Sequence, residues 1–106
     1  EQWEAGLRSG VQAAVFTHVS NVFGYILPVY VMARLCRQYG VPFVIDAAQS
    51  AGTLPLSLEN LGADFIAMPG HKGLLGPQGT GGLYVTPELE LEPLHSLLKL
   101  PKIWIS

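Results

Sequence analysis

Four short apolar runs, separated by glycine, proline and polar residues, constrain the fold of this chain more than any other feature. The runs cover residues 11–17, 42–46, 63–68 and 82–86. Runs of this length that are apolar throughout are typical of strands buried within a sheet. With a helical pattern between strands, they predict an α/β domain with a mostly parallel sheet.

The segment between the first two runs has the pattern of an amphipathic helix. Its apolar positions recur at the spacing of one helical face and are Val29, Met32, Ala33 and Cys36. Pro28 precedes the pattern, and Gly40 follows it. A second, short helical turn is expected to begin at a Ser57 cap and to end at Gly62.

The connection between the third and fourth runs differs because it is rich in glycine and has no helical pattern. A parallel crossover normally needs a helix. The last strand is therefore predicted to run antiparallel to the one before it.

Composition excludes several classes of protein. The chain has 106 residues, 49% apolar and only 13% charged, which suits one folded core and excludes intrinsic disorder. The net charge of −2 and the lack of a basic run argue against nucleic acid and anionic membrane partners. The longest apolar run, residues 25–33, contains Pro28 and is too short for a membrane span. A single cysteine cannot form an internal disulfide and favours the reducing cytoplasm.

Polar side chains gather where three predicted strands end. They are Thr17, His18, Ser20 and Asn21 after the first strand, Asp46 and Gln49 after the second, and His71 and Lys72 after the third. Ligands bind outside the carboxyl ends of the strands in open α/β sheets. These three clusters are therefore expected to form one site.

Two residues of this group allow alternative interpretations. Asp46 either caps the following turn or pairs with a cation, for which Lys72 is the natural companion. Lys72 is either a solvated surface residue or a nucleophile toward carbonyl groups. The Gly-rich segment after Lys72 matches neither a phosphate loop nor a dinucleotide fingerprint, which argues against a nucleotide-binding module.

Three segments, THVSNVFG, VIDAAQSAG and GHKGLLGPQGTGGLYV, resemble in order and spacing the class V aminotransferase-fold enzymes that use pyridoxal phosphate (PLP). The most similar branch is the cysteine desulfurase and selenocysteine lyase group. The resemblance implies part of the large domain of PLP-dependent fold type I over residues 1–93, mostly parallel with one antiparallel strand. Residues 94–106 are expected to be an unmatched tail.

The resemblance also implies a role for each candidate residue. Lys72 would form the Schiff base with PLP and move protons at the substrate, and Asp46 would pair with the pyridinium nitrogen. Gln49 and Asn21 would lie at the phenolic oxygen, and His71 would contact the phosphate. Where the family often has a serine ligand for the phosphate, this chain has Pro69.

The activity implied is removal of sulfur from L-cysteine to give alanine and a persulfide, in a homodimer with a sulfur-acceptor protein as a possible partner. The family's other catalytic residues are expected outside this chain, which would then be a fragment with little activity alone, and Cys36 is expected only to pack. A selenocysteine lyase, an aminotransferase acting on another amino acid, and a non-catalytic remnant or interaction module remain the alternatives.

Overall fold

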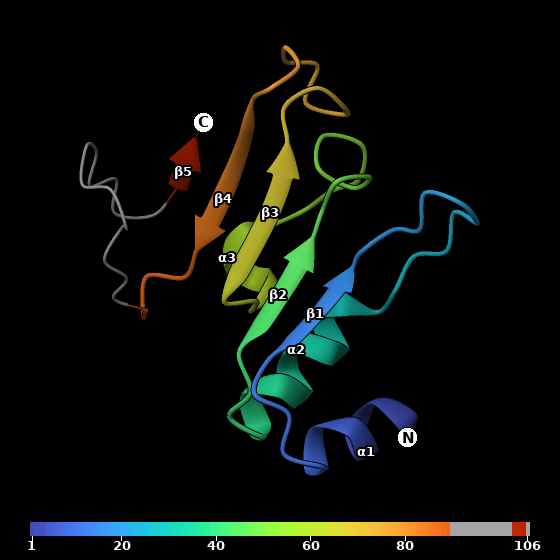
Figure 1. Cartoon of the computed structure of the whole chain (residues 1–106), viewed down its shortest axis with the longest axis vertical. Helices are drawn as coiled ribbons and strands as arrows, with labels where there is room; N and C mark the ends of the chain where they lie inside the picture. The colour runs from blue at the N-terminus through green and yellow to red at the C-terminus, as the bar shows by residue number, and fades with distance from the viewer. Residues whose placement is uncertain (90–102, 106) are drawn as a thin grey trace.

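The computed structural model describes residues 1–89 and 103–105, which form one sheet with helices against it (Figure 1). The strands lie side by side in chain order. They are β1 (Ala14–Thr17), β2 (Phe43–Asp46), β3 (Phe65–Pro69), β4 (Gly81–Val85) and β5 (Ile103–Ile105). The first three are parallel, and β4 runs antiparallel to both β3 and β5. The predicted α/β sheet, mostly parallel with one antiparallel strand, is confirmed.

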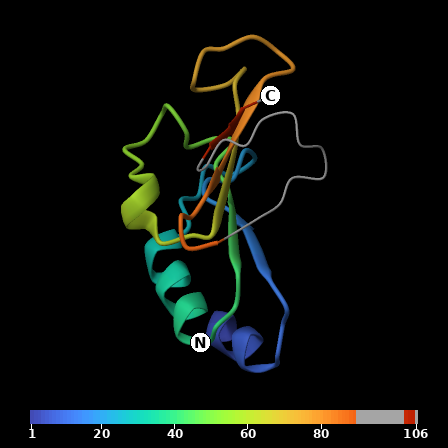
Figure 2. The same cartoon turned by 90° about the vertical axis from the view of Figure 1, so that its left-hand side faces the viewer.

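Three helices accompany the described strands: α1 (Gln2–Arg8), α2 (Val29–Gln38) and α3 (Leu58–Leu61). Figure 2 shows α2 and α3 on the same side of the sheet. The apolar face predicted for α2 is the face that the fold buries. The predicted cap of α3 also forms, because the Ser57 hydroxyl accepts a hydrogen bond from the Asn60 amide and Gly62 ends the helix with φ 78°.

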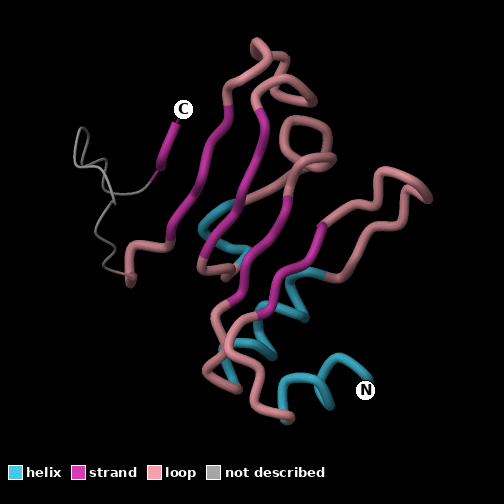
Figure 3. Tube along the Cα trace, in the orientation of Figure 1, coloured by secondary structure: helices cyan, strands magenta, loops and turns pink. Residues whose placement is uncertain are grey.

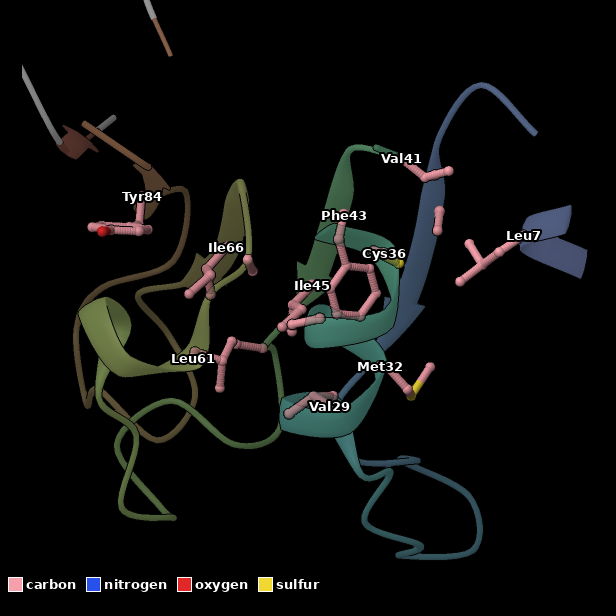
Figure 4. Close-up of a cluster of buried hydrophobic side chains, with 14 of the residues drawn as sticks. Leu7, Val29, Met32, Cys36, Val41, Phe43, Ile45, Leu61, Ile66 and Tyr84 are labelled. Atoms are coloured by element: carbon pink, nitrogen blue, oxygen red, sulfur yellow. The ribbon is translucent and has the colours of Figure 1, made fainter. Parts of the chain in front are cut away.

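The core lies between α2 and the middle of the sheet (Figure 4). Phe43, Ile45 and Ile66 are almost fully buried there. Trp3 of α1 extends the core toward the edge strand, with its ring edge-on to Phe16 at a centroid distance of 4.5 Å. This packing fixes the strands whose carboxyl ends carry the candidate site.

The first strand differs from its prediction in length and burial. It begins at Ala14, whose amide donates to Pro42 O, and Pro42 has no N–H with which to continue the ladder. β1 is the edge strand of the described sheet, and the side chain of Val15 on one of its faces is 63% exposed. The strand is therefore shorter than residues 11–17 and is not buried on both faces.

The predicted tail, residues 94–106, lies outside the described residues except for Ile103–Ile105, which pair with β4. Within the described ranges, no helix has both the length and the apolar character needed to cross a bilayer.

Candidate functional site

Three loops lie at the end of the sheet where β1, β2 and β3 finish (Figure 3). They follow these strands and contain residues 18–28, 47–57 and 70–80. Because β4 is antiparallel, it begins at the same end, and its Gly81 pairs with Pro69. The predicted convergence of the polar clusters therefore occurs at one edge.

A small hollow of about 150 Å³ opens among these loops. Its lining comes from all three, and consists of Thr17, Val19, Asn21, Asp46, Ala48, Gln49 and Lys72. Two amides, a carboxylate and an amine thus face one small space.

A larger hollow of about 580 Å³ adjoins the first and shares Asp46, Ala48 and Lys72 with it. Its remaining lining is Ala67, Met68, Pro69, His71, Gly81, Gly82 and Leu83. Its volume is within the range typical of small-molecule sites. The two hollows together bring all five predicted site residues to one place. Thr17, which the sequence placed in the first polar cluster, lines the smaller hollow. The sequence did not single out the part contributed by β4, because Gly81, Gly82 and Leu83 carry no reactive group.

The Asp46 carboxylate caps the turn that follows β2. Its Oδ1 accepts a hydrogen bond from the Ala48 amide at 2.9 Å, and the side chain is exposed. Of the two alternatives that the sequence left open for Asp46, the structure therefore shows the cap, and no ion pair of 4.0 Å or less joins Asp46 to Lys72. Both groups line the same hollow, which leaves room for a third group to contact each of them.

The turn after Asp46 is held by its own backbone. The Ala47 amide donates to Ala67 O of β3, and the Ala51 amide donates back to Ala47 O at 2.9 Å. The Thr53 hydroxyl donates a hydrogen bond to Gln49 O at 2.5 Å. Gln49 is thus held one turn beyond Asp46, which agrees with the predicted spacing.

The loop that carries Lys72 is also hydrogen-bonded internally. The Gly70 amide donates to Thr80 O at 2.7 Å and the Gly76 amide to Gly70 O at 2.6 Å. The Leu75 amide donates to Lys72 O, and Leu75 has φ 58°, which side-chain-bearing residues rarely adopt. Backbone hydrogen bonds therefore hold the two ends of the loop and the main chain at Lys72.

His18, which the sequence grouped with the polar cluster, is buried beneath the loops. Its amide donates to Asp46 O and its carbonyl accepts from the Leu27 amide. Burial lowers the pKa of its imidazole. Ser20 also has a structural role, because its hydroxyl accepts hydrogen bonds from the Val22 and Phe23 amides.

The family model described as "Aminotransferase class-V" matches residues 1–100. The chain belongs to the class-V aminotransferase family. The resemblance inferred from the sequence is therefore confirmed.

The chain is similar to two relatives and one solved structure whose names include cysteine desulfurase. A probable cysteine desulfurase of Methanothermobacter thermautotrophicus is 46% identical over 74% of this chain and 20% of the relative. The cysteine desulfurase IscS of Mannheimia succiniciproducens is 38% identical over 89% of this chain and 24% of the relative. The apo structure of a cysteine desulfurase from Thermococcus onnurineus superposes with a TM-score of 0.74 at 41% identity, covering 78% of this chain and 20% of that one. The chain thus spans about a fifth to a quarter of the length of the proteins it matches.

Proposed function

We propose that this chain carries the lysine-bearing part of a PLP site in a cysteine desulfurase-like enzyme, which removes sulfur from L-cysteine to give alanine and a persulfide. The observation that supports it most is the meeting of Lys72, Asp46 and Gln49 at two adjoining hollows. The similarity to proteins named cysteine desulfurases favours this branch over selenocysteine lyases and aminotransferases.

The residues around the two hollows fit PLP in chemistry and in available space. The amine of Lys72 would hold the cofactor, Asp46 would face its ring nitrogen, and Gln49 and Asn21 would serve its phenolic oxygen. His71 would contact the phosphate, since Pro69 has neither a hydroxyl nor an N–H to offer. When bound, PLP supplies an electron sink for bonds broken at the substrate.

The chain's own residues then have separate tasks. Asp46, oriented by the Ala48 amide, provides a negative charge that keeps a neighbouring ring nitrogen protonated. The Lys72 amine takes a proton from the substrate Cα and returns it. Both residues line the same two hollows, where they would hold opposite parts of the cofactor.

The partners proposed with this function are L-cysteine, a sulfur-acceptor protein and a second copy of the enzyme. The second copy is supported by the loop 22–26, whose apolar surface another chain would cover. This loop carries no charge, and Phe23 and Tyr25 are 74% and 70% exposed. A cytoplasmic location is proposed because the single cysteine, Cys36, is buried as a free thiol.

Borohydride trapping tests the cofactor site. The chain is mixed with PLP, reduced and digested, and pyridoxyl groups are located by mass spectrometry. We expect labelling of Lys72 at least about tenfold above Lys99 and Lys102, because a lysine in an organised site reacts with high effective concentration. Lys72→Arg, which keeps the charge, should abolish the selective label. Equal labelling of the three lysines would contradict the proposal and favour a non-catalytic remnant or interaction module.

Products identify the reaction once Lys72 is selectively loaded. A desulfurase-like site releases alanine and reducible sulfur from L-cysteine and leaves PLP in its aldehyde form. An aminotransferase would instead convert the cofactor to its amine form and release a 2-keto acid. Accumulation of the amine form would contradict the desulfurase assignment.

A further inference from the structure

The turn 50–54 and the loop 70–76 touch through their backbones at two glycines. A Cβ added to Gly52 would overlap the carbonyl group of Gly73 and lie 2.9 Å from the Leu74 nitrogen. The contact is reciprocal, because a Cβ added to Gly73 would overlap the carbonyl oxygen of Ala51. Ordinary Cβ contacts lie at 3.4–4 Å, so neither position has room for a side chain.

No hydrogen bond joins residues 50–54 to residues 70–76, all of which the structure describes. The approach therefore depends on close van der Waals packing between backbones, which only glycine permits. A methyl group at this contact would push the two segments apart by about an ångström or more.

The segments on either side of the contact carry the two halves of the candidate site. On one side, the hydrogen-bonded turn leads from Gly52 back to Gln49 and Asp46. On the other side, Gly73 is bonded directly to Lys72, whose loop is held by the Gly76–Gly70 hydrogen bond. A displacement at the contact is therefore passed to Lys72 relative to Asp46.

We propose that Gly52 and Gly73 are positioning residues that set the location of the Lys72 amine relative to Asp46 and Gln49. The proposal rests on the proposed function, because it concerns the same PLP site. Displacements of about an ångström can change reactivity about a hundredfold in organised sites. The contact between the two glycines thus determines how fast Lys72 reacts with a ligand that Asp46 and Gln49 also contact.

The chain offers a matched pair of variants. Gly52 and Gly79 both have φ +81°, but nothing lies within 4 Å of a Cβ at Gly79. Gly52→Ala and Gly79→Ala therefore both place an alanine at the same positive φ, and only the first creates a clash. Gly79 is also in the loop of Lys72, whereas Gly52 is distant from it in sequence. A local effect of loop strain would make Gly79→Ala the more damaging variant.

Two probes of Lys72 separate positioning from exposure. PLP trapping with borohydride needs the neighbouring groups, whereas reductive methylation with formaldehyde needs only an accessible amine. We expect Gly52→Ala to slow PLP trapping at Lys72 about tenfold or more, with methylation of Lys72 unchanged. Gly79→Ala should match the unaltered chain in both reactions.

The outcomes distinguish the two proposals. If the unaltered chain shows no selective PLP trapping, the proposed function fails. If it does and Gly52→Ala traps PLP equally well, the positioning role is overturned. Circular dichroism checks the fold, and Gly73→Ala, which has no positive φ, replaces Gly52→Ala should that variant not fold. If neither folds while Gly79→Ala does, the contact serves the fold as a whole and the positioning role is rejected.

Discussion

At the scale of single residues, the buried imidazole of His18 should make the stability of the fold depend on pH. Its side chain is 5% exposed, and burial lowers the pKa of the imidazole. The unfolded chain takes up a proton below about pH 6.5, whereas the folded chain resists it. Its contribution to stability is therefore complete above that pH and is lost as the pH falls toward the folded pKa.

We predict that the urea midpoint of the chain falls as the pH is lowered from about 7 to 5. His18→Gln should flatten this slope. His71→Gln is the matched control, because it makes the same substitution at an exposed histidine. Equal slopes for the unaltered chain and His18→Gln would contradict the prediction. Urea unfolding followed by circular dichroism at several pH values provides the measurement.

Residue chemistry also explains which parts of the site could be predicted. Lys72, Asp46 and Gln49 were predictable because reactive side chains at strand ends are a strong signal in parallel sheets. Of the two alternatives for Asp46, the structure shows the cap of the following turn, in which the Ala48 amide donates to the carboxylate, and no direct ion pair with Lys72. The contact between Gly52 and Gly73 could not be predicted, since it depends on how two loops approach in space.

At the scale of elements, α3 depends on its cap. It has only four residues, and the Ser57 hydroxyl accepts from the Asn60 amide at 3.3 Å. Ser57→Ala is expected to lower the free energy of unfolding by about 0.5–1 kcal/mol. Ser57→Asp keeps an acceptor and should retain most of the stability. A loss in Ser57→Asp equal to that in Ser57→Ala would contradict the cap as the cause. Both are measured by urea unfolding.

Helix α2 could be predicted from the sequence pattern of its own segment, whereas the start of β1 could not. The buried face of α2 follows from a 3.6-residue period within one segment, and the structure reproduces it at all four positions. The start of β1 was not predictable in this way. It is set by Pro42, which directly precedes the neighbouring strand β2 and is remote from β1 in sequence.

At the scale of the whole molecule, exposed apolar surface should cause association. Loop 22–26 includes Phe23 and Tyr25, which stack on one another at a centroid distance of 5.9 Å while facing solvent. We expect the chain to sediment as dimers or larger species, and the Phe23→Ser, Tyr25→Ser double variant to shift toward monomer. Leu75→Ser is the control, because Leu75 is 92% exposed but outside this loop. An equal shift in the control would contradict a specific role for loop 22–26.

The reversed direction of β4 also has a consequence for the order in which the chain folds. Pro69 pairs with Gly81, so β3 and β4 close locally around residues 70–80, a kind of event that takes about 1–10 μs. The parallel pairs join residues much farther apart, such as Ala14 with Phe43 and Val44 with Phe65, and such pairings form more slowly. During refolding of the complete chain, we therefore expect β3 and β4 to pair around Lys72 before Asp46 is beside it. Selective capture of a ligand by that lysine would report the last stage of folding.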